Sequence, residues 1–149
     1  MGGNPERKSL GTHTFIELWG CSQEVNNTES IRMALTRSVD AAGATLIELN
    51  VHQFSPYGVT GVALLAESHM SLHSWPEHGY LAADIFTCGT TCQAEKIVAV
   101  LQEIFKPELI EVQTIQRGIL PETPFATQET DFQQQGSPCQ SISTISKMS

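Results

Sequence analysis

The chain has 149 residues, of which 40% are hydrophobic and 16% charged, proportions that fit one globular domain with a substantial core. Its 16 acidic and 8 basic residues give a formal net charge of −8. This charge argues against a nucleic-acid partner, because phosphates need a basic surface. A cationic or zwitterionic small ligand suits the charge better.

No apolar run approaches the roughly 20 residues of a membrane-spanning helix, and the amino-terminal sequence lacks the apolar segment of a secretory signal. We therefore expect no membrane partner and a cytoplasmic location. In that compartment, cysteines are reduced thiols rather than a disulfide framework. The chain has four of them: Cys21, Cys88, Cys92 and Cys139.

The first part of the chain predicts an arm, a strand and a helix. Residues 1–12 are polar and glycine-rich, and we expect a flexible arm. Residues 13–21 are rich in aromatic and β-branched residues, which is typical of a strand. Apolar residues at helical spacing then predict an amphipathic helix, with Thr28 as its N-cap and Gly43 as its stop.

The middle of the chain predicts three strands. Residues 45–54 alternate, with Ile47, Leu49 and Val51 expected on one face. A proline turn at 55–58 leads into a second strand, 59–68, that pairs back onto the first. Residues 81–89 form the third strand, with Ala82, Asp84, Phe86 and Cys88 on one face.

The last part predicts a helix over 93–107, closed by a proline, and a strand over 109–120. Two helices are too few to cover both faces of the sheet. The expected fold is therefore an α+β two-layer sandwich, with a mainly antiparallel sheet and both helices on one face. This domain spans 13–120, and the polar segment 121–149 is expected to be a disordered tail.

Residues 64–89, LLAESHMSLHSWPEHGYLAADIFTCG, concentrate histidine, serine and cysteine. One interpretation is a zinc site made by Cys88 and Cys92 with His69, His73 or His78. Against it, His69 and His73 stand about 13 Å apart along an extended strand, too far for one metal unless the chain turns.

Two other kinds of chemistry use the same residues. A nucleophile, Ser68 or Cys88, could act with His73 as its base, although Ser68 lacks the flanking glycines of a serine-hydrolase elbow. Alternatively, the Ser68 hydroxyl could attack the preceding carbonyl, turning the peptide bond into an ester that eliminates to leave a pyruvoyl group. Composition and spacing leave these alternatives open.

The run FSPYGVTGVALLAESHMSLHSWPEHGYLAADIFTCG closely resembles the bacterial, class 1 S-adenosylmethionine decarboxylase proenzymes. It contains the Glu-Ser-His, His-x-Trp-Pro-Glu and Asp-x-Phe-Thr-Cys-Gly elements of that family. The resemblance extends more loosely over about residues 13–118, including the ELWGC element near the start. A run of several short motifs in order is far more specific than one motif alone.

The resemblance implies cleavage between Glu67 and Ser68, after which Ser68 becomes a pyruvoyl group. That group would form a Schiff base with the substrate and act as the electron sink for decarboxylation, with no need for pyridoxal or a metal. His73 matches the family's proton acceptor in processing. Cys88 matches the donor that protonates the substrate carbon after carbon dioxide leaves.

The resemblance also implies roles for three residues outside that set. Phe54 matches an aromatic residue that stacks on adenine, and Glu77 is a candidate contact for the ribose. Thr60 stands where the family has a serine whose hydroxyl assists processing. Threonine keeps the hydroxyl but restricts its side-chain rotamer, so processing is expected to be slower or its role to shift.

The expected enzyme is a dimer of processed αβ pairs that converts S-adenosylmethionine to decarboxylated S-adenosylmethionine, the aminopropyl donor for spermidine. Two alternatives remain open at this point. The same pyruvoyl chemistry could act on ornithine or arginine, or an unprocessed homologue could bind S-adenosylmethionine or regulate a partner. Retention of Ser68, His73 and Cys88 together argues against the second.

Overall fold

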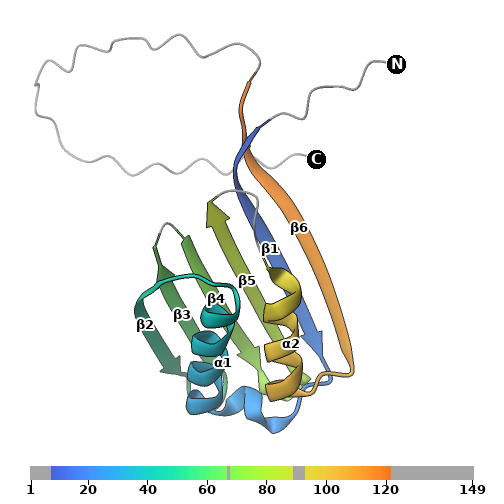
Figure 1. The fold of residues 1–149 in the computed structure, drawn as a ribbon. Helices are drawn as coiled ribbons and strands as arrows, with labels where there is room; N and C mark the ends of the chain where they lie inside the picture. Colours follow the sequence, from blue (N-terminus) through green and yellow to red (C-terminus); the bar gives the residue numbers. More distant parts are fainter. Residues whose placement is uncertain (1–7, 67, 89–92, 122–149) are drawn as a thin grey trace, which may run out of the picture.

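Six strands form one antiparallel sheet in the part of the chain that the computed structural model describes, residues 8–66, 68–88 and 93–121 (Figure 1). The strand order is β2-β3-β4-β5-β1-β6. Strands β2, β3, β4 and β5 follow one another in the sheet as they do in the chain, each pairing with the next as a hairpin. Strand β1 lies between β5 and β6 and pairs with both. The strands are β1 (Ser9–Trp19), β2 (Leu46–Gln53), β3 (Val59–Leu65), β4 (Ser68–Trp75), β5 (Tyr80–Cys88) and β6 (Leu109–Ile119).

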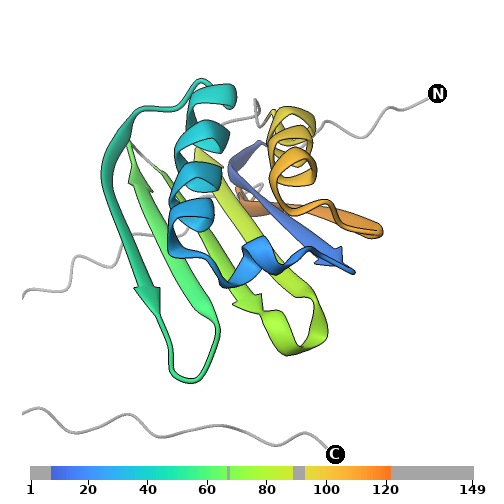
Figure 2. The same ribbon diagram turned by 90° about the horizontal axis from the view of Figure 1, so that it is seen from below.

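Two helices, α1 (Thr28–Ala41) and α2 (Ala94–Phe105), lie side by side on one face of this sheet, which Figure 2 shows from below. Strand residues alternate between this face and the other one. The core lies between the helices and the sheet, and burial of its apolar side chains is the main stabilising contribution. Its fully buried members include Ile16, Leu18, Ile31, Leu35, Met70, Leu72, Leu81, Ile85, Ile97, Leu101 and Phe105.

Within the described residues, no helix covers the opposite face of the sheet, and we call this face the open face (Figure 2). Polar and ionisable side chains lie across its middle strands. Several large apolar side chains on this face are also exposed. By strand alternation and register, the open face includes His13, Glu17, Thr60, Val62, Leu64, His69, Ser71, His73, Trp75, Asp84, Phe86, Cys88, Ile115 and Arg117.

The expected fold class is confirmed, but the strand count is not, because the sequence interpretation omitted β4. It ran one strand from 59 to 68, whereas β3 ends at Leu65 and β4 begins at Ser68. Only residues 66 and 67 connect these strands, and neither is a glycine, proline or asparagine that would mark a turn. The predicted face of Asp84, Phe86 and Cys88 on β5 is confirmed.

Two strand predictions need correction. The sequence placed residues 9–12 in a flexible arm, but they belong to β1, because β6 reaches far enough to pair Ser9 with Ile119. Ile47 does not share the face of Leu49 and Val51. It is 61% exposed, because the register of β2 shifts between Leu46 and Glu48.

The helix start also differs from the expectation. Asn27, not Thr28, caps α1, and its side-chain oxygen accepts hydrogen bonds from the backbone of Glu29 and Ser30.

No helix in the described ranges has the length and apolar character needed to cross a membrane. Residues 1–7 of the expected arm and 122–149 of the expected tail lie outside the described residues.

Candidate active site

Thr60 and His73 form a hydrogen-bonded pair on the open face. They stand directly opposite each other on β3 and β4, with 2.9 Å between Thr60 Oγ1 and His73 Nδ1. For His73 to act as a base through Nε2, the hydrogen must sit on Nδ1, which then donates to Thr60 Oγ1. The threonine hydroxyl can therefore select the tautomer that makes His73 a base.

A hollow of about 380 Å³ adjoins this pair, and its lining includes Phe54, Thr60, His73, Trp75 and Glu77. Phe54 is 51% exposed, so its ring has a surface available to a planar ligand. The His52 ring meets that of Phe54 edge to face, with centroids 4.8 Å apart. The structure thus brings four of the expected site residues to one place, which we call the His73 end: Phe54, Thr60, His73 and Glu77.

Ser68 and Cys88 lie on the neighbouring strands β4 and β5 at the opposite end of the sheet, which we call the Ser68 end. Ser68 is the first residue of β4, and Cys88 is the exposed last residue of β5. Because His69 pairs with Phe86, Ser68 lies beside Thr87, one residue from Cys88. Glu67 lies outside the described residues.

The two ends are too far apart for direct chemistry within one chain. Ser68 and His73 are five residues apart on one strand, which corresponds to about 16 Å. Their side chains also point to opposite faces of the sheet. Ser68 pairs with the buried Leu65 and so faces the helices by alternation, whereas His73 is on the open face. The expected site residues therefore form two groups, and His73 does not approach Ser68.

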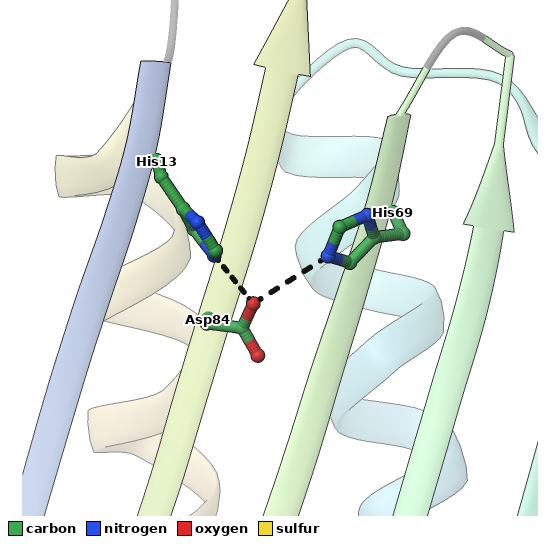
Figure 3. A group of neighbouring side chains, drawn as sticks. All are labelled: His13, His69 and Asp84. Atoms are coloured by element: carbon green, nitrogen blue, oxygen red, sulfur yellow. Dashed lines mark hydrogen bonds and ion pairs between the residues drawn. The ribbon is translucent and has the colours of Figure 1, made fainter. Parts of the chain in front are cut away.

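Between the two ends, His13, Asp84 and His69 form a network on β1, β5 and β4 (Figure 3). His13 Nε2 is 2.7 Å from Asp84 Oδ2, and His69 Nε2 is 3.6 Å from the same oxygen. Ser71 donates a hydrogen bond to the other carboxylate oxygen. Burial raises the pKa of Asp84, but the hydrogen bonds from Ser71 and His13 and the nearby imidazoles outweigh it and lower that pKa below its usual value.

These three residues have the composition of a metal site, and their candidate ligand atoms lie within 4.8 Å of one another. However, Arg117 Nη1 lies 3.2 Å from His13 Nδ1. Because arginine only donates, Nδ1 accepts, and the hydrogen of His13 sits on Nε2, where it is donated to Asp84. A metal would need that Nε2 lone pair, so a hydrogen-bond network describes the cluster better.

The sequence interpretation of zinc relied on other residues. It used Cys88 and Cys92, and Cys92 lies outside the described residues. The sequence missed the grouping of His13 with Asp84, although alternation had placed Asp84 on the face of Cys88. No local pattern could reveal it, because His13 and Asp84 are 71 residues apart and meet only when β1 pairs with β5.

The comparisons with known proteins agree on one family. The family described as S-adenosylmethionine decarboxylase matches residues 12–118. An S-adenosylmethionine decarboxylase proenzyme of Methanococcus maripaludis is 50% identical over 114 residues, 76% of this chain and 93% of that protein. The proenzyme of Thermomicrobium roseum is 46% identical over 114 residues, 76% of this chain and 97% of that protein.

The fold agrees with the sequence comparison. The crystal structure of the adenosylmethionine decarboxylase from Aquifex aeolicus superposes with a TM-score of 0.70 at 37% sequence identity. The match covers 78% of this chain and 98% of that one. With this fold and relatives of this identity, the chain belongs to the S-adenosylmethionine decarboxylase family.

Proposed function

We propose that this chain is a self-processing, pyruvoyl-dependent enzyme that decarboxylates S-adenosylmethionine. The observation that carries the proposal is the 50% identity to an S-adenosylmethionine decarboxylase proenzyme. This chain also has Ser68, His73 and Cys88 in the Glu-Ser-His, His-x-Trp-Pro-Glu and Asp-x-Phe-Thr-Cys-Gly elements. These residues supply a nucleophile, a base and an acid.

In processing, Ser68 Oγ attacks the carbonyl carbon of Glu67, and the peptide C–N bond breaks as an ester forms. His73 then removes the α-proton of Ser68, and elimination releases the Glu67 carboxylate. Water converts the remaining dehydroalanine to a pyruvoyl group and ammonia. The products are residues 1–67 and residues 68–149.

The position of Ser68 suits a pyruvoyl group. As the first residue of β4 it becomes a chain end, with no preceding peptide to fix its carbonyl, and it lies beside Thr87, the residue before Cys88. The pyruvoyl carbonyl supplies the electron sink for decarboxylation. Cys88 delivers the proton to the substrate carbon that has lost carbon dioxide, since its side chain is exposed on the open face of the adjacent strand.

We infer that the site is completed by a second copy of the chain. His73 is about 16 Å from Ser68 along β4, beyond the reach of a proton transfer. Two copies packed through their open faces, with their strands running in opposite directions, would bring the His73 end of one over the Ser68 end of the other. The exposed apolar side chains on this face support such packing: Trp19, Val62, Leu64, Trp75 and Ile115.

In this arrangement, the substrate lies between the copies. The second copy contributes Phe54, whose exposed ring stacks on adenine, and Glu77, whose carboxylate accepts hydrogen bonds from the ribose. The first copy contributes Ser68 and Cys88, which act on the amino-acid part of the substrate.

Thr60→Val should accumulate uncut chain, because valine has the shape of threonine without the hydroxyl that holds the His73 tautomer. We expect cleavage to slow by about tenfold or more, in line with loss of a well-placed hydrogen bond. Thr60→Ser keeps the hydroxyl and should be cleaved at least as fast as wild type. Time courses on denaturing gels measure both, and equal rates for wild type and Thr60→Val would show that the hydroxyl is not used.

Cys88→Ala should separate processing from turnover. The variant should still be cleaved, because His73 supplies the base, but decarboxylation should fall by about 10²–10⁴-fold for want of the acid. Without that proton, carbon dioxide loss should be followed more often by protonation at the pyruvoyl carbon, which inactivates the enzyme. Mass spectrometry of residues 68–149 during turnover detects this change, and unimpaired turnover would remove Cys88 from the role.

The function as a whole is tested by a denaturing mass spectrum and a carbon dioxide assay. The wild-type protein should separate into two fragments, with a ketone in place of an amine at the start of the larger one. Carboxyl-labelled S-adenosylmethionine should release labelled carbon dioxide, and cyanoborohydride should trap that substrate on residues 68–149. Trapping of ornithine or arginine instead would reject the substrate but keep the chemistry, and an intact, active chain would reject self-cleavage.

A further inference from the structure

Arg117 and Cys88 occupy one row across three strands. Gly11 on β1 is the register partner of Cys88 on β5 and of Arg117 on β6. Two strand spacings separate the outer residues, so their Cα atoms are about 10 Å apart. Gly11 has no side chain to fill the space between them, and a Cβ there would meet the Phe86 ring at 2.6 Å.

The Arg117 guanidinium is held in place on the open face. It lies 5.7 Å from the centroid of the Phe86 ring, and its Nη1 contacts His13 Nδ1 at 3.2 Å. These contacts orient the charge but do not neutralise it. Within the described residues, Arg117 has no carboxylate at ion-pair distance, whereas Arg32 and Arg37 are each paired with a glutamate.

This arginine lines a hollow of about 530 Å³ next to the Ser68 end. The hollow is also lined by Leu10, His69, Phe86 and Gly118. His69 follows Ser68 directly, and Phe86 is two residues from Cys88 on the same face. A positive charge without a carboxylate partner therefore borders the place where the amino-acid part of the substrate must lie.

We propose that Arg117 binds the α-carboxylate of the substrate, an inference that rests on the function proposed above. The carbon that loses the carboxylate is also the carbon that Cys88 protonates, so the group that binds the carboxylate and the Cys88 thiol must both lie close to that one carbon. An arginine fork matches a carboxylate with two parallel N–H···O bonds, which Phe86 and His13 pre-orient. When the carbon–carbon bond breaks, the carboxylate leaves as uncharged carbon dioxide. The ion pair with Arg117 is then lost, so this arginine binds the substrate but not the product.

Arg117→Met should therefore weaken binding of the substrate but not of its product. We expect the KM for S-adenosylmethionine to rise about tenfold or more, the usual effect of losing a charge-assisted pair. The inhibition constant of decarboxylated S-adenosylmethionine should change less than about twofold, since that product has no carboxylate. Arg117→Lys keeps the positive charge, so its KM for S-adenosylmethionine should lie between those of wild type and Arg117→Met. Arg32→Met removes an equal charge from α1 on the other face of the sheet, and it should change neither the KM nor the inhibition constant.

A second measurement avoids turnover. In a Ser68→Ala background, calorimetry should show that Arg117→Met lowers the affinity of the protein for S-adenosylmethionine. Its affinity for decarboxylated S-adenosylmethionine should not change. Equal losses for both ligands would mean that Arg117 only supports Phe86 and His13, and unchanged binding would remove it from the site; either result overturns the proposal. Failure of the proposed function is a separate outcome, since wild type would then remain uncut and release no carbon dioxide from S-adenosylmethionine.

Discussion

Ser68→Ala should remain one chain of 149 residues and release no carbon dioxide from S-adenosylmethionine. Alanine has no hydroxyl to attack the Glu67 carbonyl, so the ester and the pyruvoyl group cannot form. Activity should be absent rather than reduced, because Ser68 supplies the electrophile itself and no neighbouring residue can replace it. A denaturing mass spectrum and the labelled carbon dioxide assay measure both effects.

Ser71→Ala is the matched control for this substitution. Ser71 lies on the same strand, and its hydroxyl is a donor to Asp84. Its removal costs one hydrogen bond in the His13–Asp84–His69 network but leaves the cleavage chemistry intact, so the chain should still be cut. Cleavage of Ser68→Ala, or carbon dioxide release from it, would assign the reaction to another residue.

Co-expression of Ser68→Ala with His73→Ala should restore cleavage that neither variant shows alone. In a mixed dimer, the His73→Ala chain keeps its Ser68 and receives the base from the second copy. With random pairing, about half of the His73→Ala chains are in mixed dimers, so about half of them should be cut. This expectation follows from the separation of about 16 Å between Ser68 and His73 in one chain.

Different affinity tags on the two variants distinguish the chains in this experiment. Only the His73→Ala chain should yield fragments, and decarboxylase activity should appear in dimers that carry both tags. His73→Ala alone should stall as uncut chain or as the ester, which hydroxylamine cleaves. If the mixture stays entirely uncut while mixed dimers are present, the base does not come from a second copy.

Much of the fold follows from local patterns in the sequence. Composition, alternation and helical spacing predicted five of the strands and both helices, because these signals depend only on neighbouring residues. The small number of helices predicted that only one face of the sheet is covered. The strand β4 was missed because its connection to β3 carries no turn residue. The start of β1 was placed too late because Ser9 is held by Ile119, a partner far away in the chain.

The sequence by itself determined which family this protein belongs to and which reactive side chains it carries: short motifs place Ser68, His73 and Cys88 in a recognisable order. Only the tertiary structure decided how these groups are arranged. Strand register separates Ser68 from His73, joins Thr60 to His73 and groups His13 with Asp84 and His69. It also aligns Arg117 with Cys88 across Gly11. The physical reason is that motifs record which side chains are present, whereas pairing between distant strands decides which of them meet.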